Sequence, residues 1–430
     1  MTWYKQLHWQ IVIGLVLGLL WGLFSSAVGI NGFTTEFIKP LGTVFITLLK
    51  LIAIPLVLAS LVIGVTSLND TAKLSRMGGK TIAVYLVTTV LAITIGLALV
   101  NLLRPGSALP PETREDLMTS YQGNLAAGGD AQVEQQSLME FFVRIVPENA
   151  VSSFADNSSM LQVVFVAILL GIGLSNIPMQ KGQALVEVFG ALNDVIIKIV
   201  DLIMKVAPYG VFALMAGVIV DLAGDDLGRA FQLLTALGWY SLCVVLGLIL
   251  HVLLVYSSLF KLFSKMPLLD FFRAIRPALL LGFSTSSSSA TLPVTMERVQ
   301  KNLGVDDEVA SFVLPIGATI NMDGTSLYQA IAAVFIAQAL GMDLTVAQQL
   351  TIVLTATLAS IGTAGVPGAG IIMLVIVLQS VQVPVEGIAL ILGVDRILDM
   401  GRTVVNVTGD AAVSVVVAQT EGKLGSIHLD

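Results

Sequence analysis

The sequence has few charged residues and almost no cysteine or histidine. Asp, Glu, Lys and Arg together make up 12% of its 430 residues, while 56% of the residues are apolar. Charged residues account for about a quarter of an ordinary soluble chain. The mean hydropathy is +0.90. This composition excludes an ordinary soluble domain and predicts a polytopic membrane protein.

The scarcity of cysteine and histidine excludes further classes. Cys243 is the only cysteine, so the chain cannot form an internal disulfide, and we expect this residue to fill space in an apolar helix. The histidines are His8, His251 and His428. None lies in a segment that carries chemistry, which argues against a hydrolase with a serine nucleophile at 284–289 and against a transition-metal site. The net charge is −7 without a basic stripe, so we expect no nucleic-acid partner.

Long apolar segments are abundant, and eight of them can each cross about 30 Å of hydrocarbon. They lie around residues 10–30, 41–68, 81–103, 160–176, 191–222, 232–260, 309–340 and 388–419. The first is too long for the apolar region of a signal peptide and has no clear cleavage site after it, so we expect it to be retained as a helix. Two segments, 270–303 and 345–382, are left over.

The lysines and arginines of the loops predict the orientation of the chain. If the N-terminus is inside, most of them lie in the cytoplasm, as membrane proteins prefer. This holds only if each leftover segment enters the membrane and returns to the side from which it came. We therefore predict an all-α protein with eight transmembrane helices and two re-entrant helical hairpins, with both termini in the cytoplasm.

Two tracts of small residues mark the expected hairpin tips. They read "STSSSSATLP" at 284–293 and "ASIGTAGVPGAG" at 359–370. Serine hydroxyls compete for backbone partners, and glycine and proline interrupt a helix. Irregular backbone at membrane depth is tolerated only around a cavity or a bound solute. The tips should therefore surround a site.

Each predicted hairpin is followed by polar residues within an apolar span. These are "NMDGT" from Asn321 and "DMGRT" from Asp399, and we expect the helix to be interrupted at both. Because the two hairpins enter from opposite sides, the two units have opposite topology. Inverted repeats with broken helices that meet in mid-membrane are typical of secondary transporters.

The stretch "DRILDMGRTVVNVTGD" at 395–410 places five polar side chains on one helix face. They are Asp395, Asp399, Arg402, Asn406 and Asp410. Arg402 carries a planar fork that matches a carboxylate, and Asp399 can accept a hydrogen bond from an ammonium group. Together they would bind a zwitterion with an additional acid. The alternative is an ion pair between the two residues within the helix.

Other polar residues suggest cation binding. Asp323 and Asp410 each neighbour a glycine, where we expect an unwound turn, and hard oxygen ligands suit hard cations. The alternative is that both are hydrogen-bonded core residues. Tyr85, Thr88 and Thr89 share a helix face, which is more often an ordinary contact between helices.

The serines of the first tract have a role of their own in this prediction. Ser287 and Ser288 can receive a carboxylate at a helix start, because the first backbone N–H groups of a helix are free. The alternative is a solvated serine linker.

Four motifs make the chain resemble the glutamate transporter family, the dicarboxylate/amino acid:cation symporters. They are "SSSSATLPVTM", "GATINMDGT", "ASIGTAGVPGAG" and "DMGRTVVNVTGD", in the family's order and spacing. The chain is most similar to the prokaryotic sodium-coupled aspartate or glutamate carriers. The resemblance implies elevator-type symport of acidic amino acids with Na⁺ and no organic cofactor. Alternatives are coupling to protons, a neutral amino acid or C4-dicarboxylate as substrate, and, in another class, an ion channel for anions.

The resemblance also implies the roles of individual residues. The substrate-binding residues would be Ser286, Ser287, Ser288, Met322, Thr325, Val366, Gly368, Asp399, Arg402, Thr403 and Asn406. One sodium site would comprise Gly317, Asn321, Asn406 and Asp410; a second Thr319, Ser360, Ile361 and Thr363; a third Tyr85, Thr88, Thr89, Asn321 and Asp323. Met322 would touch both the ions and the substrate.

The same resemblance implies a homotrimer in the inner membrane of a prokaryote. Residues 1–70 and 150–228, with spans one, two, four and five, would form a scaffold and trimerisation domain. Residues 71–149 would hold span three, which belongs to the transport domain, and an extracellular loop. Residues 229–420 would form the rest of the transport domain, with both hairpins.

Overall fold

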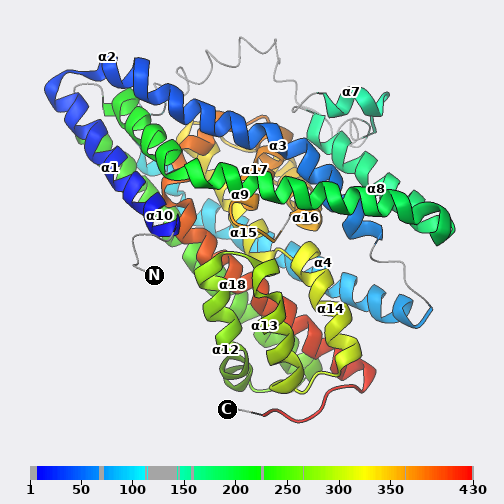
Figure 1. Ribbon diagram of the computed structural model, residues 1–430. Coiled ribbons are helices and arrows are strands. Elements are labelled where there is room, and N and C mark those ends of the chain that lie inside the picture. The colour runs from blue at the N-terminus through cyan, green and yellow to red at the C-terminus, as the bar shows by residue number, and fades with distance from the viewer. Residues whose placement is uncertain are drawn as a thin grey trace.

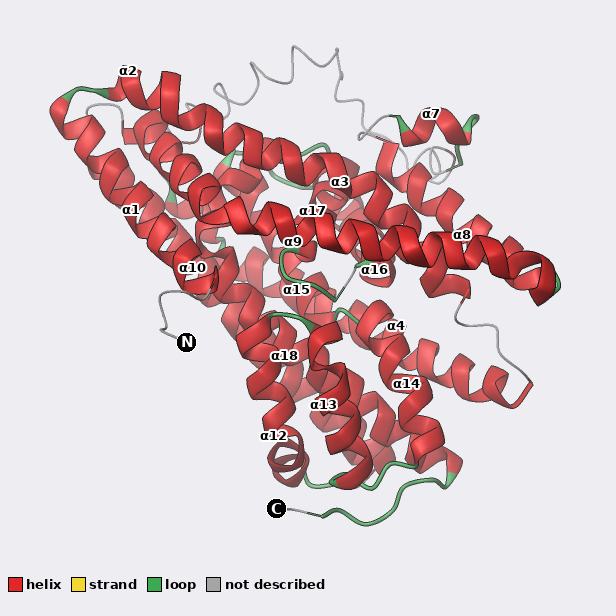
Figure 2. Ribbon diagram, in the orientation of Figure 1, coloured by secondary structure: helices red, strands yellow, loops and turns green. Residues whose placement is uncertain are grey.

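The computed structural model is built from helices, which the two ribbon views show (Figures 1 and 2). It describes residues 7–66, 72–111, 114, 143, 146–155, 159–223, 227–264, 266–363 and 365–428. In this part of the chain, an isolated antiparallel bridge between Val305 and Leu424 is the only β-pairing. Most of the predicted extracellular loop lies outside the described residues.

The described residues of the first half of the chain form nine elements. They are α1 (Leu7–Val28), α2 (Asn31–Phe33), η2 (Thr34–Ile38), α3 (Lys39–Thr66), α4 (Ala72–Leu103), η3 (Pro105–Ala108), α7 (Ala150–Phe154), α8 (Met160–Asn176) and α9 (Met179–Ala223).

The second half, as far as the structure describes it, contributes twelve further elements. They are α10 (Leu227–His251), η5 (Val252–Tyr256), α11 (Ser257–Leu259), η6 (Phe260–Ser264), α12 (Leu268–Thr285), α13 (Ser288–Lys301), α14 (Asp307–Ile320), α15 (Asp323–Ala339), α16 (Val346–Gly362), α17 (Ala369–Ser380), η7 (Val385–Gly387) and α18 (Ile388–Glu421).

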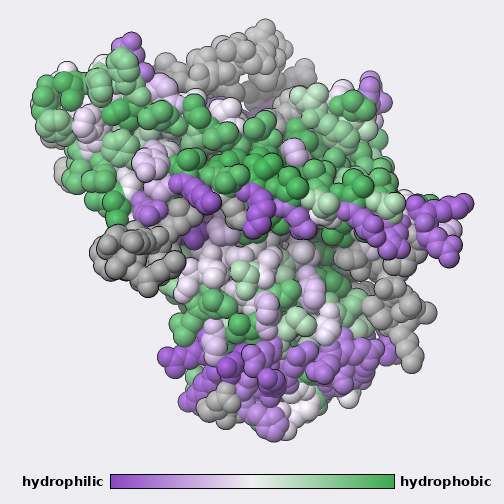
Figure 3. All heavy atoms as spheres, viewed as in Figure 1, coloured by the Kyte–Doolittle hydropathy of each residue, from purple (hydrophilic) through white to green (hydrophobic). Residues whose placement is uncertain are grey.

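The helices α1, α3 and α8 gather around the long helix α9 (Figure 1). Glycines allow the close approach of α1 to α9, because an added Cβ at Gly14 or Gly18 would lie 2.3 or 2.4 Å from the carbonyl oxygen of Pro208 or Phe212. Small residues at helix interfaces are common in membrane proteins for this reason. Figure 3 shows hydrophobic residues spread over this part of the surface, while hydrophilic residues gather at the ends of α12, α13 and α14.

The helices α4, α10 and α12 to α18 form a second group with its own core. All 17 residues of α15 are buried, and α4, α16, α17 and α18 pack against this helix. Cys243 of α10 is fully buried among apolar neighbours, as expected from the sequence.

Two helix pairs lie where the hairpins were predicted. In the first pair, Ser286 ends α12 in the left-handed region with φ 52°, and Ser287 caps α13 by accepting a hydrogen bond from the N–H of Ala290. In the second pair, Gly368 has φ 81° and precedes α17, a backbone angle that favours glycine. That either pair re-enters a membrane stays a prediction.

The tips of the two pairs touch. The hydroxyl of Ser287 donates to the carbonyl oxygen of Gly365 at 2.6 Å, and the N–H of Ser289 donates to the same oxygen at 3.2 Å. The two tracts of small residues, more than 70 positions apart, are thus joined through one backbone carbonyl.

One of the two predicted helix breaks is confirmed. The chain leaves the helical path at Asn321 and Met322, between α14 and α15. The predicted break at Asp399 is wrong, because α18 is continuous over 34 residues, and Asp410 therefore lies in regular helix and not in an unwound turn. The polar side chains of α18 pair with one another and with neighbouring elements, so the helix keeps its own backbone hydrogen bonds.

Charged side chains join the start of α4 to the end of α18. Lys80 lies 2.5 Å from the carboxylate of Glu421, and Arg76 also pairs with this carboxylate. Hydrogen bonds from Lys80 and Arg76 lower the pKa of Glu421. The tail after α18 pairs with residues 302–306 through backbone hydrogen bonds such as that from Gly425 N–H to Gly304 O at 2.7 Å.

Three helical segments in the described part of the chain are long and apolar enough to cross a membrane. They are Trp9–Val28, Arg76–Ala108 and Gln232–Ser264. A bent pair within α9, Gln180–Val200 and Lys205–Asp221 with an angle of 52°, would make a fourth. The number of eight spans stays a prediction.

Candidate substrate and cation sites

The polar face of α18 points into the protein. Asp395, Asp399, Arg402, Asn406 and Asp410 are each no more than 6% exposed. The predicted common face is therefore present and buried, so each of these side chains must find a polar partner in the interior.

Arg402 is fully buried and uses only part of its guanidinium group. Its Nη2 lies 2.8 Å from Asp399 Oδ1 and 3.0 Å from Asp395 Oδ1, and its Cζ lies 3.8 Å from the ring centroid of Tyr328. Nε and Nη1 make no hydrogen bond with the described residues. The ion pair within the helix, which the sequence offered as the alternative, is thus formed, and two donor atoms of the fork remain free. Asp395, to which the sequence assigned no role, is the second anionic partner.

The carboxylate of Asp399 has three polar contacts with described residues. Besides Arg402, its Oδ2 lies 3.4 Å from Nη1 of Arg396 and accepts a hydrogen bond from the N–H of Gly368 at 3.3 Å. The carboxylate therefore connects α18 to the start of α17. Sequence reasoning missed Arg396, although its spacing of three residues from Asp399 places the two on neighbouring positions of a helix.

A small pocket lies where the hairpin tips, α15 and α18 meet. Its volume is about 10 Å³, on a scale on which one water molecule needs about 10 to 15 Å³. The pocket is lined by Ser286, Ser288, Met322, Thr325, Thr363, Gly365, Val366, Ala369, Gly370, Asp399, Thr403 and Asn406.

Eight of the eleven predicted substrate residues line this pocket, and three do not. Ser287 is engaged with Gly365, and Gly368 lines a neighbouring pocket. Arg402 lies behind the pocket wall, where an added Cβ on Gly370 would come within 3.0 Å of its Nη1. Sequence reasoning missed the lining residues Gly365, Ala369 and Gly370 and assigned Thr363 to a cation.

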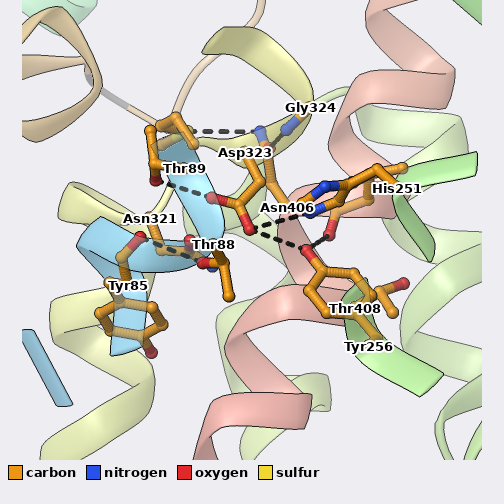
Figure 4. Close-up of polar contacts among 12 residues, drawn as sticks. Tyr85, Thr88, Thr89, His251, Tyr256, Asn321, Asp323, Gly324, Asn406 and Thr408 are labelled. Atoms are coloured by element: carbon orange, nitrogen blue, oxygen red, sulfur yellow. Dashed lines mark hydrogen bonds and ion pairs between the residues drawn. The ribbon is translucent and has the colours of Figure 1, made fainter. Parts of the chain in front are cut away.

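Asp323 lies at the centre of a buried polar cluster (Figure 4). Its Oδ1 accepts a hydrogen bond from Thr89 at 2.7 Å, and its Oδ2 accepts one from the hydroxyl of Tyr256 at 3.0 Å. His251 Nε2 lies 3.2 Å from the same Oδ2. His251 and Tyr256, from α10 and η5, were missed because they are 72 and 67 residues away from Asp323, in a segment without a motif.

A second group of oxygen atoms surrounds Gly317. The side-chain amide of Asn321 donates to Asp410 Oδ1 at 2.9 Å, while Asn321 Oδ1 has no hydrogen-bond partner among the described residues. A Cβ on Gly317 would lie 2.5 Å from both Asp410 Oδ1 and the hydroxyl of Tyr85. The absence of a side chain at Gly317 thus allows a carboxylate and a phenol, which are hard ligands, to approach the backbone closely.

Comparison of the sequence with known proteins identifies the family of this chain. The model of the sodium:dicarboxylate symporter family matches residues 7–420. The chain belongs to the sodium:dicarboxylate symporter family. It is therefore a multi-pass membrane transporter, a dicarboxylate or glutamate symporter coupled to cations.

Individual relatives of this symporter are similar over nearly their whole length. A proton/sodium-glutamate symport protein of Geobacillus stearothermophilus is 36% identical over 417 residues, which cover 97% of this chain and 95% of the relative. A proton/glutamate-aspartate symporter of Escherichia coli (strain K12) is 36% identical, with 97% and 93% covered. A C4-dicarboxylate transport protein of Bacillus subtilis (strain 168) is 35% identical, with 98% and 95% covered.

The residues of the symporter's second predicted sodium site do not all lie together in the structure. The hydroxyl of Ser360 donates to Ile320 O at 2.9 Å and accepts from Met322 N–H at 3.1 Å, so it satisfies both sides of the helix break. Thr319 is exposed, and its hydroxyl donates to Ile316 O at 2.9 Å. The other two members of this set are Ile361, which is partly exposed, and Thr363, which is buried.

The residues of the third predicted sodium site are joined by hydrogen bonds to one another and to neighbouring helices. Thr88 donates to the carbonyl oxygen of Tyr85 at 3.0 Å, and the hydroxyl of Tyr85 donates to Val313 O at 3.1 Å. Thr89 reaches Asp323 from the same helix, whereas the ring of Tyr85 points away from Asp323 (Figure 4).

Asn406 joins the symporter's pocket to Met322, which was predicted to touch both the ions and the substrate. Its Oδ1 accepts a hydrogen bond from Gly324 N–H at 2.8 Å, and its Nδ2 donates to Thr325 Oγ1 at 3.2 Å and to Met322 Sδ at 3.3 Å. The helix break before α15 is therefore held directly against α18.

Proposed function

We propose that the chain is a secondary active transporter that imports aspartate, glutamate or both together with Na⁺. The observation that carries this proposal is Arg402, a buried arginine whose Nε and Nη1 make no hydrogen bond in the described part of the chain, beside a pocket whose wall includes Asp399. A planar cation and an anion side by side match the side-chain carboxylate and the ammonium group of an acidic amino acid.

In the proposed complex, Arg402 binds the side-chain carboxylate and Asp399 binds the amino group. Asn406, Ser288 and the backbone at Ser286 and Ser287 receive the main carboxylate. The remaining contacts come from Met322, Thr325, Val366, Gly368 and Thr403. A pocket with room for about one water molecule cannot admit an amino acid. Binding therefore requires the hairpin tips to separate, with the second hairpin acting as the gate.

We propose that Na⁺ is carried as a co-substrate by the oxygen groups around Gly317 and Asp323, as well as by the set that contains Ser360. Importing a net anion against about 100 mV requires about 2.3 kcal/mol, and each tenfold gradient about 1.4 kcal/mol more. One Na⁺ that enters down a tenfold gradient and this potential returns about 3.7 kcal/mol. One ion therefore supports only about tenfold accumulation, and more than one oxygen-rich group is consistent with several ions.

The elevator mechanism assigns different roles to the two helix groups. The packing of α1, α3 and α8 around α9 supports residues 1–70 and 150–228 as a scaffold. The packing of α4 and α10 against α15 and α18 supports a transport domain that contains span three and residues 229–420. In this proposal the protein is a homotrimer in the inner membrane with cytoplasmic termini.

The proposed function is tested with the purified protein in proteoliposomes. We expect labelled aspartate or glutamate to accumulate only with an inward Na⁺ gradient, to respond cooperatively to Na⁺ and to carry charge. Accumulation driven equally well by a proton gradient without Na⁺ would replace sodium by proton coupling. Ion flux without stoichiometric solute uptake would favour a channel, and uptake restricted to serine or to succinate would overturn the proposed substrate class.

His251 provides a prediction about the cation sites. Replacing His251 with alanine removes one of the two groups that contact Asp323 Oδ2. We expect the Na⁺ concentration for half-maximal uptake to rise roughly tenfold, because losing a hydrogen bond to a buried charged group has an effect of about that size.

The control for this prediction is the exposed His428, whose replacement with alanine should change nothing. His251→Gln keeps an N–H donor and should show a smaller shift than alanine. If the sodium dependence of His251→Ala matches that of the unmodified protein, His251 does not orient Asp323 for cation binding.

A further inference from the structure

We infer that Arg396 determines specificity, because it keeps Asp399 paired when a substrate has no amino group. The inference rests on the proposed function and extends its substrate class to four-carbon dicarboxylates without an amine. Arg396 acts on the substrate through Asp399 and is a positioning residue.

The two oxygens of Asp399 have different partners. Oδ1 pairs with Arg402 at 2.8 Å, whereas Oδ2 faces Arg396 at 3.4 Å and the N–H of Gly368 at 3.3 Å. The carboxylate that would receive the substrate's amino group therefore has a cationic partner within the protein.

Arg396 is buried beside Asp399 and its chain neighbour Asp395. Its side chain is about 7% exposed. It lines a pocket together with Asp395, Asp399 and apolar side chains, among them Ile11 of α1, Phe45 of α3 and Val211 of α9. Among the described residues, Asp399 is the only ion-pair partner of Arg396, and Nε of Arg396 has no hydrogen-bond partner.

The charges on this part of α18 balance without a substrate. Asp395 and Asp399 supply two negative charges, and Arg396 and Arg402 supply two positive charges. Because Arg402 contacts both aspartates through Nη2, its Nη1 or its Nε, which make no hydrogen bond with the described residues, can each donate to a carboxylate while the ion pairs persist. A second carboxylate can then enter the site whether or not an amine accompanies it.

The consequence concerns substrates that lack the amine. A site that depends on a substrate's polar group rejects an analogue without it by about 10⁴- to 10⁵-fold, because the buried group of the protein is left unpaired. Here Arg396 and Gly368 N–H remain on Asp399 when the amine is absent. The discrimination between aspartate and succinate should therefore be far smaller than this.

The experiment compares inhibition of labelled aspartate uptake by unlabelled aspartate and by unlabelled succinate, with the full chain in proteoliposomes. For the unmodified protein we expect the inhibition constant of succinate to lie within about 100-fold of that of aspartate, well below the discrimination against an unpaired group. In Arg396→Gln we expect this ratio to rise at least tenfold, mainly through weaker succinate binding. Arg396→Lys keeps a cation and should retain most of the succinate binding.

Arg273→Gln is the matched control. Arg273 pairs with Asp270 at the same spacing of three residues, but its side chain is 61% exposed, so its loss should leave the ratio unchanged. If the inhibition constant of succinate is more than 10⁴ times that of aspartate in the unmodified protein, the inference is overturned before any variant is tested. An unchanged ratio in Arg396→Gln also overturns it.

The two proposals fail in different ways. If the unmodified protein shows no sodium-driven aspartate uptake, the proposed function fails. Labelled succinate then becomes the tracer, and retained succinate uptake in Arg396→Gln would overturn the inference as well. Aspartate uptake with a ratio that does not depend on Arg396 overturns only the inference.

Discussion

Replacing Arg402 with glutamine is expected to lower the uptake of aspartate and glutamate by at least about 10³-fold, because a buried carboxylate of the substrate loses its only charged partner. Arg402 is fully buried and has two free donor atoms beside the pocket. Neutral amino acids lack this carboxylate and depend less on the guanidinium group. In Arg402→Gln, the ability of serine to compete for uptake should therefore fall much less than that of glutamate.

The same substitution also affects folding, and this effect has to be separated from binding. Arg402 neutralises Asp395 and Asp399, and breaking a buried ion pair costs about 3 to 5 kcal/mol of stability. In the double variant Asp395→Asn with Arg402→Gln, one buried charge is removed together with its partner. We expect thermal unfolding measurements to show recovered stability, while aspartate uptake stays lost.

The control for Arg402 is again the exposed pair on α12. Arg273→Gln should leave both uptake and unfolding temperature unchanged. Equal losses of serine and aspartate binding in Arg402→Gln, with the protein still folded, would remove Arg402 from substrate selection.

Replacing Gly317 with alanine is expected to raise the Na⁺ concentration for half-maximal uptake by at least about tenfold, or to abolish sodium-driven uptake. The new Cβ would lie 2.5 Å from Asp410 Oδ1 and from the hydroxyl of Tyr85. It would displace these oxygens from the positions in which they would meet a cation. A shift of this size corresponds to at least about 1.4 kcal/mol of binding free energy.

Gly238→Ala on α10 is the matched control for this substitution. An added Cβ there has no neighbouring atom within 4 Å, and alanine favours a helix over glycine by about 1 kcal/mol. Sodium dependence should be unchanged in this variant. The same result for Gly317→Ala would show that the space beside Asp410 holds no coupling ion.

The sequence predicted those parts of the fold that depend on local chemistry. The tips near Ser286 and Gly368 follow from small residues that interrupt helices, and the break at Asn321 follows from polar residues beside a glycine. The same reasoning was wrong at Asp399, because it treated buried polar side chains as a sign of unwound backbone. In α18 these side chains are satisfied by partners such as Arg402 and Asn321, which allows the helix to continue.

The candidate site was predictable where its residues lie in motifs and unpredictable where contacts come from elsewhere. Asp323 was identified from "NMDGT", but its partners His251 and Tyr256 lie in an apolar segment of α10 and η5. No local pattern connects them to Asp323, because only the packing of the helices brings them together. Arg396 is a different case, since its position one turn before Asp399 was visible and its burial was not.

The contact between the two hairpin tips contributes to the free-energy difference between the closed pocket and an open one. Two hydrogen bonds, from Ser287 and Ser289, converge on the carbonyl oxygen of Gly365. Each is worth about 0.5 to 1.5 kcal/mol net, so together they favour closure by only about 5- to 150-fold. Open molecules would then form a minor but constant fraction at equilibrium, and the solute would enter by capturing that fraction rather than by forcing the tips apart.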